Sequence, residues 1–409
     1  MRNYHLDDYG QFSIENYQNM RPFSSFLPGI AGPMGVPLWV FYVNRGQAIA
    51  SFGVENKDKP ILEYQPANRA YQLTSYLGFR TFIRLKRGNK QGFYEPFLPG
   101  CSSQQMVIGA NELRLLEVNR GRGLQTEVVY FLLPGENLAG LVRMVKVTNL
   151  SEKTTSLEML DGLPAVIPFG VNNQLLKDIG RTVEAWMEVY NLEQKVPYYR
   201  LRASVADTDE GSTFEAGHFM LAFRDSVDGQ NILPVIVDPK MVFGQNTALI
   251  TPEAFIQKEL RELLAQKQIT CGKTPCGFAT LQAVLGPGES VQINSLYGHV
   301  SRLEDIQSQI ERLTSTTYIN KKRREANELV RNLTEVISCR TGSPTFDAYC
   351  RQTFIDNILR GGWPIVFGKG KEPKIYHIYS RKHGDLERDY NAFSFAPEFY
   401  SQVMAVTGT

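Results

Sequence analysis

A polar and aromatic segment in the last part of the chain has the residue types from which sugar-binding sites are built. It lies between Ile375 and Asn391, and its candidate substrate-binding residues are Arg381, His383, Asp385, Arg388, Asp389 and Tyr390. Carboxylates and amides bind pairs of hydroxyl groups, arginine and histidine donate hydrogen bonds, and aromatic rings cover the apolar faces of a sugar. A surface loop rich in ion pairs has the same composition, so composition alone leaves both interpretations open.

Metal and cofactor chemistry is not indicated. His377 and His383 lie near Asp385 and could ligate a metal, but the spacing implies no third ligand. Cys271 and Cys276 form one pair without the second pair that structural zinc sites normally have. The sequence also has no glycine-rich phosphate loop, nucleophile elbow or zinc-protease helix. We therefore expect no metal and no cofactor, and we assign no catalytic residue.

Composition excludes several kinds of partner. The chain has 409 residues and a formal net charge of +2, which creates no general attraction for nucleic acid or an anionic membrane. No apolar run approaches the ~20 residues that a membrane span needs, and the first residues lack the apolar core of a signal peptide. Five scattered cysteines fit reduced thiols better than a disulfide framework. We expect a cytoplasmic protein without a nucleic-acid or membrane partner.

Alternating apolar residues and turn residues predict a mainly β protein. Many short segments of this kind are separated by Gly, Pro and Asn, which is typical of a large antiparallel sandwich. Strands are predicted at 38–43, 79–85, 127–133, 141–147, 200–205, 218–223, 278–285 and 290–297. Helical spacing predicts an interrupting helix at about 173–190, and a second one that begins at Thr251-Pro252, with Thr251 as its N-cap.

The pattern changes to helical spacing at about residue 302. Residues 302–338 are predicted to form a connector of one or two helices, and residues 346–359 a further helix that ends at Gly361-Gly362. The basic run Lys321–Arg324 lies within the connector. Nucleic-acid binding is one interpretation of this run, but a solvated helix face is the default.

Several segments together resemble the glycoside phosphorylases that include cellobiose phosphorylase, and the closer match is to the 1,2-β-oligoglucan phosphorylases. The similarity extends from about Tyr9 to Gln402. It is specific as a set, and the segments that carry it are Phe23–Gly32, Pro33–Trp39, Arg181–Met187, Tyr376–Asn391, Phe393-Ser394 and Pro397–Gln402.

This resemblance implies a fold and its division into domains. The family has a β-supersandwich, a helical linker, an (α/α)6 barrel and a small C-terminal sandwich. Carried over to this chain, it implies a supersandwich of the galactose-mutarotase type at residues 1–301 and a helical linker at 302–340. Residues 341–409 would be the truncated start of the barrel, with an aberrant tail at 403–409.

The resemblance also implies a reaction, which is the reversible, inverting phosphorolysis of a β-glucosidic bond to α-glucose 1-phosphate. An inverting glycosidase needs an acid for the leaving oxygen and a base to activate water. Inorganic phosphate, the co-substrate of the family, is already an anionic nucleophile, so one carboxylic acid suffices. In the family that acid and the phosphate-binding residues lie downstream of position 409. The six residues between Arg381 and Tyr390 would support the sugar.

The end of the chain departs from the family pattern after Gln402. The family continues with Gly-Asn-Gly, an aromatic residue and Arg-Asp, whereas this chain has Val403 to Thr409. The nucleotides GGTAATGGCAGTTACCGGGAC encode Gly-Asn-Gly-Ser-Tyr-Arg-Asp, and without the first G they give the residues of this tail. We therefore expect that one base was lost after codon 402. DNA without an open frame for a barrel downstream of that codon would disprove this.

Two alternatives stay open. The chain could be a non-catalytic carbohydrate-binding or dimerisation module, because family sandwiches often contact the partner subunit of a homodimer. It could also be the corresponding part of a cellobiose-type phosphorylase, since the residues that select the linkage lie partly downstream.

Overall fold

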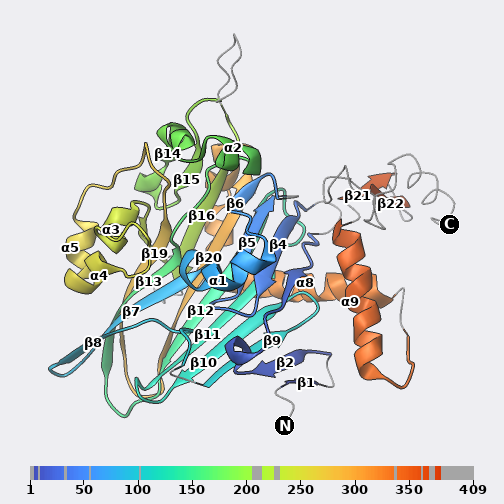
Figure 1. Ribbon diagram of the computed structural model, residues 1–409, viewed down its shortest axis with the longest axis horizontal. Helices are drawn as coiled ribbons and strands as arrows, with labels where there is room; N and C mark the ends of the chain where they lie inside the picture. Colours follow the sequence, from blue (N-terminus) through green and yellow to red (C-terminus); the bar gives the residue numbers. More distant parts are fainter. Residues whose placement is uncertain are drawn as a thin grey trace.

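The computed structural model confirms a mainly antiparallel β protein with helices. It describes residues 4–7, 10–31, 35–54, 57–100, 103–204, 214–224, 231–335, 339–360, 363–367 and 374–378. Figure 1 shows the sheets as one layered body, with the helix α9 to one side. The predicted barrel beyond residue 378 lies outside the described residues.

One large sheet of eleven strands forms the first layer, and all neighbouring strands in it are antiparallel. Its order is β1 (Tyr4–Leu6), β2 (Phe12–Glu15), β9 (Ser103–Ile108), β10 (Leu113–Asn119), β11 (Leu124–Leu132), β12 (Ala139–Asn149), β20 (Ser290–Val300), β16 (Gly217–Arg224), β15 (Tyr198–Leu201) and β14 (Met187–Tyr190), with β17 (Asn231–Ile232) paired to β16.

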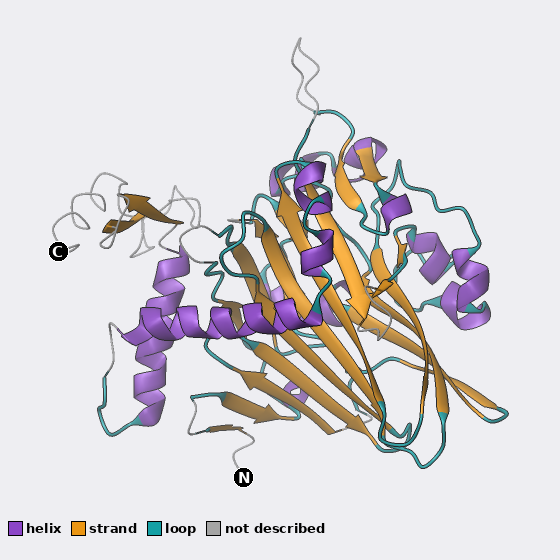
Figure 2. Cartoon of the chain, turned by 180° about the vertical axis from the view of Figure 1, so that it is seen from behind, coloured by secondary structure: helices purple, strands orange, loops and turns teal. Residues whose placement is uncertain are grey.

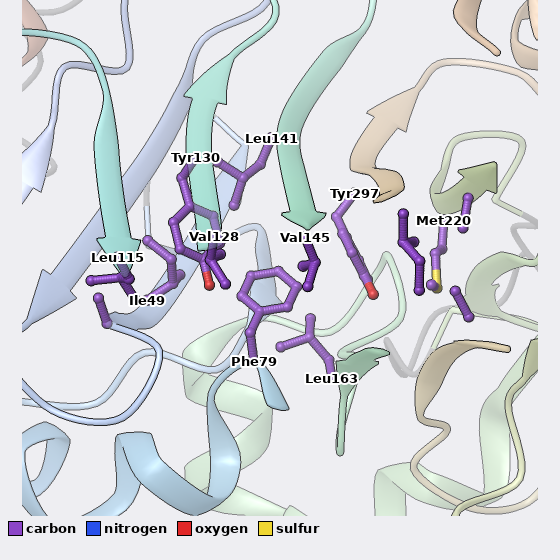
Figure 3. Packing of buried hydrophobic residues seen from close by; sticks show 14 of the residues in the cluster. Ile49, Phe79, Leu115, Val128, Tyr130, Leu141, Val145, Leu163, Met220 and Tyr297 are labelled. Atoms are coloured by element: carbon purple, nitrogen blue, oxygen red, sulfur yellow. The ribbon is translucent and has the colours of Figure 1, made fainter. Parts of the chain in front are cut away.

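Two smaller sheets form the second layer. The five-stranded sheet has the order β18 (Val235–Ile236), β19 (Gly277–Leu285), β13 (Thr155–Leu163), β7 (Arg80–Arg87) and β8 (Lys90–Tyr94). The four-stranded sheet has the order β3 (Ser24–Leu27), β4 (Leu38–Val43), β5 (Ile49–Val54) and β6 (Pro60–Leu62). One buried cluster contains residues of all three sheets, and Figure 3 shows its side chains meeting between the strands. This arrangement is a β-sandwich, as the sequence predicts.

The large sheet is apolar on both faces. On β11, Val128 and Tyr130 point into the sandwich, while Val129 and Phe131 belong to a second buried cluster on the opposite face. Helices of the connector cover that second face, which explains why the run around residues 127–133 is almost continuously apolar rather than strictly alternating.

The helices lie on the outer faces of the sheets. The helix α1 (Ala67–Leu77) packs on the four-stranded sheet. Three short helices pack on the five-stranded sheet: α3 (Pro239–Phe243), α4 (Glu253–Gln257) and α5 (Leu260–Leu264). The connector consists of α6 (Leu303–Gln307), α7 (Ile310–Leu313) and α8 (Thr316–Glu335). Figure 2 shows α8 lying across the large sheet, followed by α9 (Pro344–Arg360).

A fully buried ion pair joins the two layers. Arg143 on β12 donates from Nε to Asp161 Oδ2 on β13 at 3.0 Å and from Nη2 to Asp161 Oδ1 at 2.7 Å. Both side chains have an exposed fraction of 0%. Thr81 on β7 donates to the same Asp161 Oδ1 at 2.7 Å, and Gln47, which precedes β5, accepts from Arg143. The network therefore ties the large sheet to both smaller sheets.

The predicted helix at 173–190 is wrong over most of its length. The α-helix is only α2 (Asn173–Asp178), followed by a 3₁₀ helix at Gly180–Trp186 and then by the strand β14. Asn172 caps α2 by accepting a hydrogen bond from the N–H of Leu175. The apolar spacing continues beyond Gly180, but β14 gains its backbone hydrogen bonds from β15 instead. Tertiary pairing overrides the local helical pattern there.

Three further predictions differ from the structure in detail. The helix expected at Thr251-Pro252 begins at Glu253, and Pro252 rather than Thr251 is the N-cap, without a side-chain capping bond. The strand predicted at 200–205 is observed at Tyr198–Leu201, and the connector has three helices rather than one or two. The helix predicted at 346–359 is confirmed as α9.

Candidate functional site

The six residues predicted to bind sugar lie outside the described residues. They are Arg381, His383, Asp385, Arg388, Asp389 and Tyr390, and the possible metal ligands His383 and Asp385 are among them. The chain just before them is described as a hairpin of β21 (Trp363–Phe367) and β22 (Lys374–Ile378), in which His377 pairs with Pro364. In the described part of the chain, no three His, Cys, Asp or Glu residues are grouped to hold a metal.

Two regions far apart in sequence meet beside α9. Ile30, Val330 of α8 and Ile355 of α9 form one buried cluster, against which Leu329, Leu333 and Phe354 pack. The N–H of Gly135 donates to the carbonyl oxygen of Ala31 at 2.7 Å, which fixes this loop against the turn between β11 and β12. The N-terminal segment that carries part of the family resemblance therefore supports the connector and the helix that follows it.

A buried carboxylate docks the connector onto the sandwich. Glu136 lies in the turn between β11 and β12 and accepts from Lys322 at 2.7 Å, from Arg312 at 2.6 Å and from the hydroxyl of Tyr318. Lys322 also donates to the carbonyl oxygen of Pro134 at 3.0 Å. Burial alone would raise the pKa of Glu136, but the hydrogen bonds of Lys322 and Tyr318 and the two positive charges lower it.

The basic run Lys321–Arg324 is therefore not simply a solvated face. Lys322 is buried against Glu136, and Arg323 makes two short contacts with Glu112, Nε to Oε2 at 2.6 Å and Nη2 to Oε1 at 2.5 Å. Half of the run serves to attach α8 to turns of the large sheet, since Glu112 lies between β9 and β10 and Glu136 between β11 and β12. The charges of Lys322 and Arg323 are already paired with carboxylates, which argues against nucleic-acid binding by these two side chains.

Two histidines that the sequence analysis did not select lie next to each other. His218 on β16 and His299 on β20 are opposite in register, and their ring centroids are 5.2 Å apart. Phe169 lies over His299 with a centroid distance of 4.8 Å. No spacing signal could have paired them, because only the register of two distant strands brings them together.

His218 is an electrostatically unusual group. Its side chain is buried, and its Nδ1 has no hydrogen-bond partner among the described residues. Burial lowers the pKa of His218 well below its ordinary value, the neighbouring His299 lowers it further, and a backbone hydrogen bond of Pro60 opposes this. The imidazole is therefore neutral at physiological pH, and its burial favours a structural role over acid–base catalysis.

Glu117 on β10 is a second buried group with a strongly shifted pKa. Its Oε2 accepts from the N–H of Phe97 at 2.6 Å and from the side-chain amide of Gln104 at 2.7 Å. The amide of Gln18 donates to Gln104 Oε1 at 2.7 Å, so the carboxyl lies within a chain of buried polar groups. Burial raises the pKa of Glu117 to about 7, against the opposing effect of the Phe97 N–H. With 1% of its surface exposed, Glu117 cannot contact a substrate.

Replacing Glu117 by glutamine should remove a pH dependence of stability. The folded state holds the proton more tightly than the unfolded chain, so stability falls as pH rises from the ordinary pKa of 4.5 through about 7. From about pH 5 to about pH 8, the free energy of unfolding of Glu117→Gln should rise relative to the unsubstituted protein by about 2–3 kcal/mol. Urea unfolding at a series of pH values measures this. Parallel curves for both proteins across the range would contradict it.

Comparison with known proteins does not assign the chain to a family. No family model matches the sequence, and no curated protein matches it. Among solved structures, the chain is similar to a polysaccharide lyase, with 12% identity and a TM-score of 0.38 over 68% of this chain and 34% of the other. It is also similar to a protein described as a kojibiose phosphorylase from human microbiome, with 6% identity and a TM-score of 0.30 over 90% of this chain and 40% of the other.

A third similar structure is the GH36 α-galactosidase of Geobacillus stearothermophilus, with 10% identity and a TM-score of 0.29 over 73% of this chain and 41% of the other. The chain thus spans between about a third and two fifths of the length of these three proteins. All three names describe carbohydrate-active enzymes. Likenesses at these TM-scores carry no argument about the activity of this chain.

No described helix is both long enough and apolar enough to cross a membrane.

Proposed function

We propose that the chain is the N-terminal part of an inverting glycoside phosphorylase. The whole enzyme would cleave β-linked glucooligosaccharides, with β-1,2 linkages, using inorganic phosphate, and would release α-glucose 1-phosphate. The observation that carries the proposal is the order of elements: a three-sheet sandwich, a connector docked on its large sheet, and α9 leading toward the segment that resembles the family. The division at residues 301 and 340 is part of this proposal.

The described residues also bear on where the chemistry occurs. A phosphorolysis of this type needs a carboxylic acid beside the leaving oxygen and cationic groups around the phosphate. Glu117 has a suitable pKa but is buried inside the sandwich, and Glu136 is engaged with the connector. The general acid is therefore expected in the catalytic barrel and not in the sandwich, with Arg381 and its neighbours supporting the sugar.

The chain as it stands should release no glucose 1-phosphate from β-1,2-glucooligosaccharides and phosphate. The reason is that the family resemblance places the general acid downstream of residue 409. A coupled assay for glucose 1-phosphate measures this, with the same assay on cellobiose as the comparison for the cellobiose-type alternative. Robust release by this chain would show that an acid lies within it.

A second form of the protein tests the activity itself. If the DNA downstream of codon 402 holds the expected open frame, inserting one G there should give a longer product that releases glucose 1-phosphate from the β-1,2 substrate. A longer product that acts only on cellobiose would favour the alternative specificity, and one without activity on either substrate would refute the phosphorylase.

Two further parts of the proposal concern assembly and location. Sedimentation of the same proteins tests the proposed homodimer, and fractionation of cells tests the proposed cytoplasmic location.

A further inference from the structure

A pocket with a volume of about 610 Å³ lies on the outer face of the five-stranded sheet. The hairpin of β7 and β8 forms one side, and the short helices α4 and α5 form the other. Figure 1 shows these elements together at the edge of the molecule away from α9. This volume is within the range of about 300–1,000 Å³ that is typical of small-molecule sites.

The floor of the pocket is a fixed arginine. Arg84 Nε donates to Glu158 Oε2 at 2.8 Å, and Nη2 lies 2.6 Å from the same oxygen without hydrogen-bond geometry. The guanidinium group stacks over the ring of Phe255 at 4.9 Å, and only 7% of the side chain is exposed. Gln282 donates to the other oxygen of Glu158 at 3.0 Å. Nη1 donates to the carbonyl oxygen of Ile256 at 3.5 Å, so the arginine is held in place before any ligand arrives. A second N–H on Nη1 is still available as a donor.

The walls of the pocket combine one aromatic ring with neutral and acidic polar groups. Phe93 is half-buried, and its ring is fixed between Phe82 and Phe255 at centroid distances of 6.2 and 6.5 Å. Gln91, Gln257 and Glu262 line the pocket from exposed positions. Each glutamine amide can both donate and accept a hydrogen bond, as each sugar hydroxyl can.

These groups select among ligand classes. The charge of Arg84 is already balanced by Glu158, and Glu262 adds a negative charge at the rim, so a phosphate or nucleic acid is disfavoured. Phe93 and Ile256 are the apolar side chains that line the pocket, too few for a lipid chain. A neutral polyol with an apolar face satisfies the aromatic ring, the amides and the arginine together.

We propose that this pocket binds a β-linked glucooligosaccharide. The inference rests on the proposed function for its substrate class, since the residues themselves select a neutral oligosaccharide but not its linkage. A site of this kind would hold a polymeric substrate on the sandwich through groups that take no part in bond cleavage. Within the described residues, no hydrogen bond engages the side-chain amides of Gln91 or Gln257, so both are free for a ligand.

The test is calorimetric titration of the chain with a series of β-1,2-glucooligosaccharides. We expect binding by the unsubstituted protein and at least about tenfold weaker binding by the double variant Gln91→Ala, Gln257→Ala, because two hydrogen-bonding groups are lost. Both side chains are exposed, so unfolding in urea should be unchanged. The matched control is Gln266→Ala, an exposed glutamine just after α5 that does not line the pocket, and its affinity should equal that of the unsubstituted protein.

The remaining outcomes separate this inference from the proposed function. Equal binding by the double variant and the unsubstituted protein would overturn the pocket while leaving sugar binding elsewhere in the chain intact. Absence of binding by the unsubstituted protein would also overturn the pocket, but the phosphorylase would still be decided by glucose 1-phosphate release from the restored frame. Equal loss of affinity in Gln266→Ala would show a general surface effect and overturn the assignment to these residues.

Discussion

Replacing Asp161 by alanine is expected to lower the free energy of unfolding by about 3–5 kcal/mol, because it leaves the charge of Arg143 buried and without its carboxylate. Both side chains are fully buried between the layers. Burial alone would lower the pKa of Arg143, and Asp161 is the largest cause that raises it, so the variant loses this support. Arginine is not deprotonated in proteins, however, so the guanidinium group of the variant stays charged and buried. Urea unfolding followed by circular dichroism measures the change.

A double variant separates the buried charge from simple loss of packing. Replacing Arg143 by methionine and Asp161 by leucine removes both charges and keeps apolar volume, so it should cost clearly less than Asp161→Ala alone. Tyr130 and Thr81 would each lose a partner and keep only a hydrogen bond to Gln47, which is why some loss is still expected. A change below about 1 kcal/mol for Asp161→Ala would contradict the importance assigned to this ion pair.

The second large effect is expected at the connector. Glu136→Ala should lower the free energy of opening of α8 by about 2–3 kcal/mol, because Lys322, Arg312 and Tyr318 all lose a common charged acceptor. Hydrogen exchange of the backbone amides of α8 measures this. The strands β4 and β5 lie in the other layer, so their amides should keep their protection.

The control for this prediction lies on the same helix. Glu328 pairs with Arg331 at 3.8 Å, and the two side chains are 63% and 69% exposed, so Glu328→Ala should change the opening of α8 by no more than about 1 kcal/mol. Equal exchange rates in the Glu136 and Glu328 variants would show that Glu136 does not hold the connector. Faster exchange throughout the sandwich would instead indicate general unfolding.

The strands could be predicted from the sequence because alternation and turn residues are local properties. The run at 38–43 forms β4 with the predicted bounds, and the run at 141–147 lies within β12, which is longer at both ends. The helix at 173–190 failed because its apolar spacing, which fits a helix, is used by a short helix, a 3₁₀ helix and an edge strand in turn. Pairing with β15 decides the end of that segment, and no local pattern reveals a partner strand.

The polar sites were less predictable, since their members are distant in sequence. His218 meets His299, and Arg84 meets the helices near residue 256, only through strand order and register. The role of Lys322 could not be predicted from the basic run, because its partner Glu136 lies far away in sequence, in the turn between β11 and β12. The polar segment around Arg381 was selected by residue types alone, and its role stays a prediction.

The pairing at the centre of the large sheet constrains how this chain can acquire its structure. Residues 139–148 of β12 pair with residues 290–299 of β20, while the other neighbour of β12 is the adjacent strand β11. During synthesis, one edge of β12 therefore remains unpaired until β20 has been synthesised and can pair with it. Contacts this distant in sequence slow folding and prolong the exposure of apolar strand edges. We expect the nascent chain to depend on chaperones during that interval more than a sandwich built from successive hairpins would.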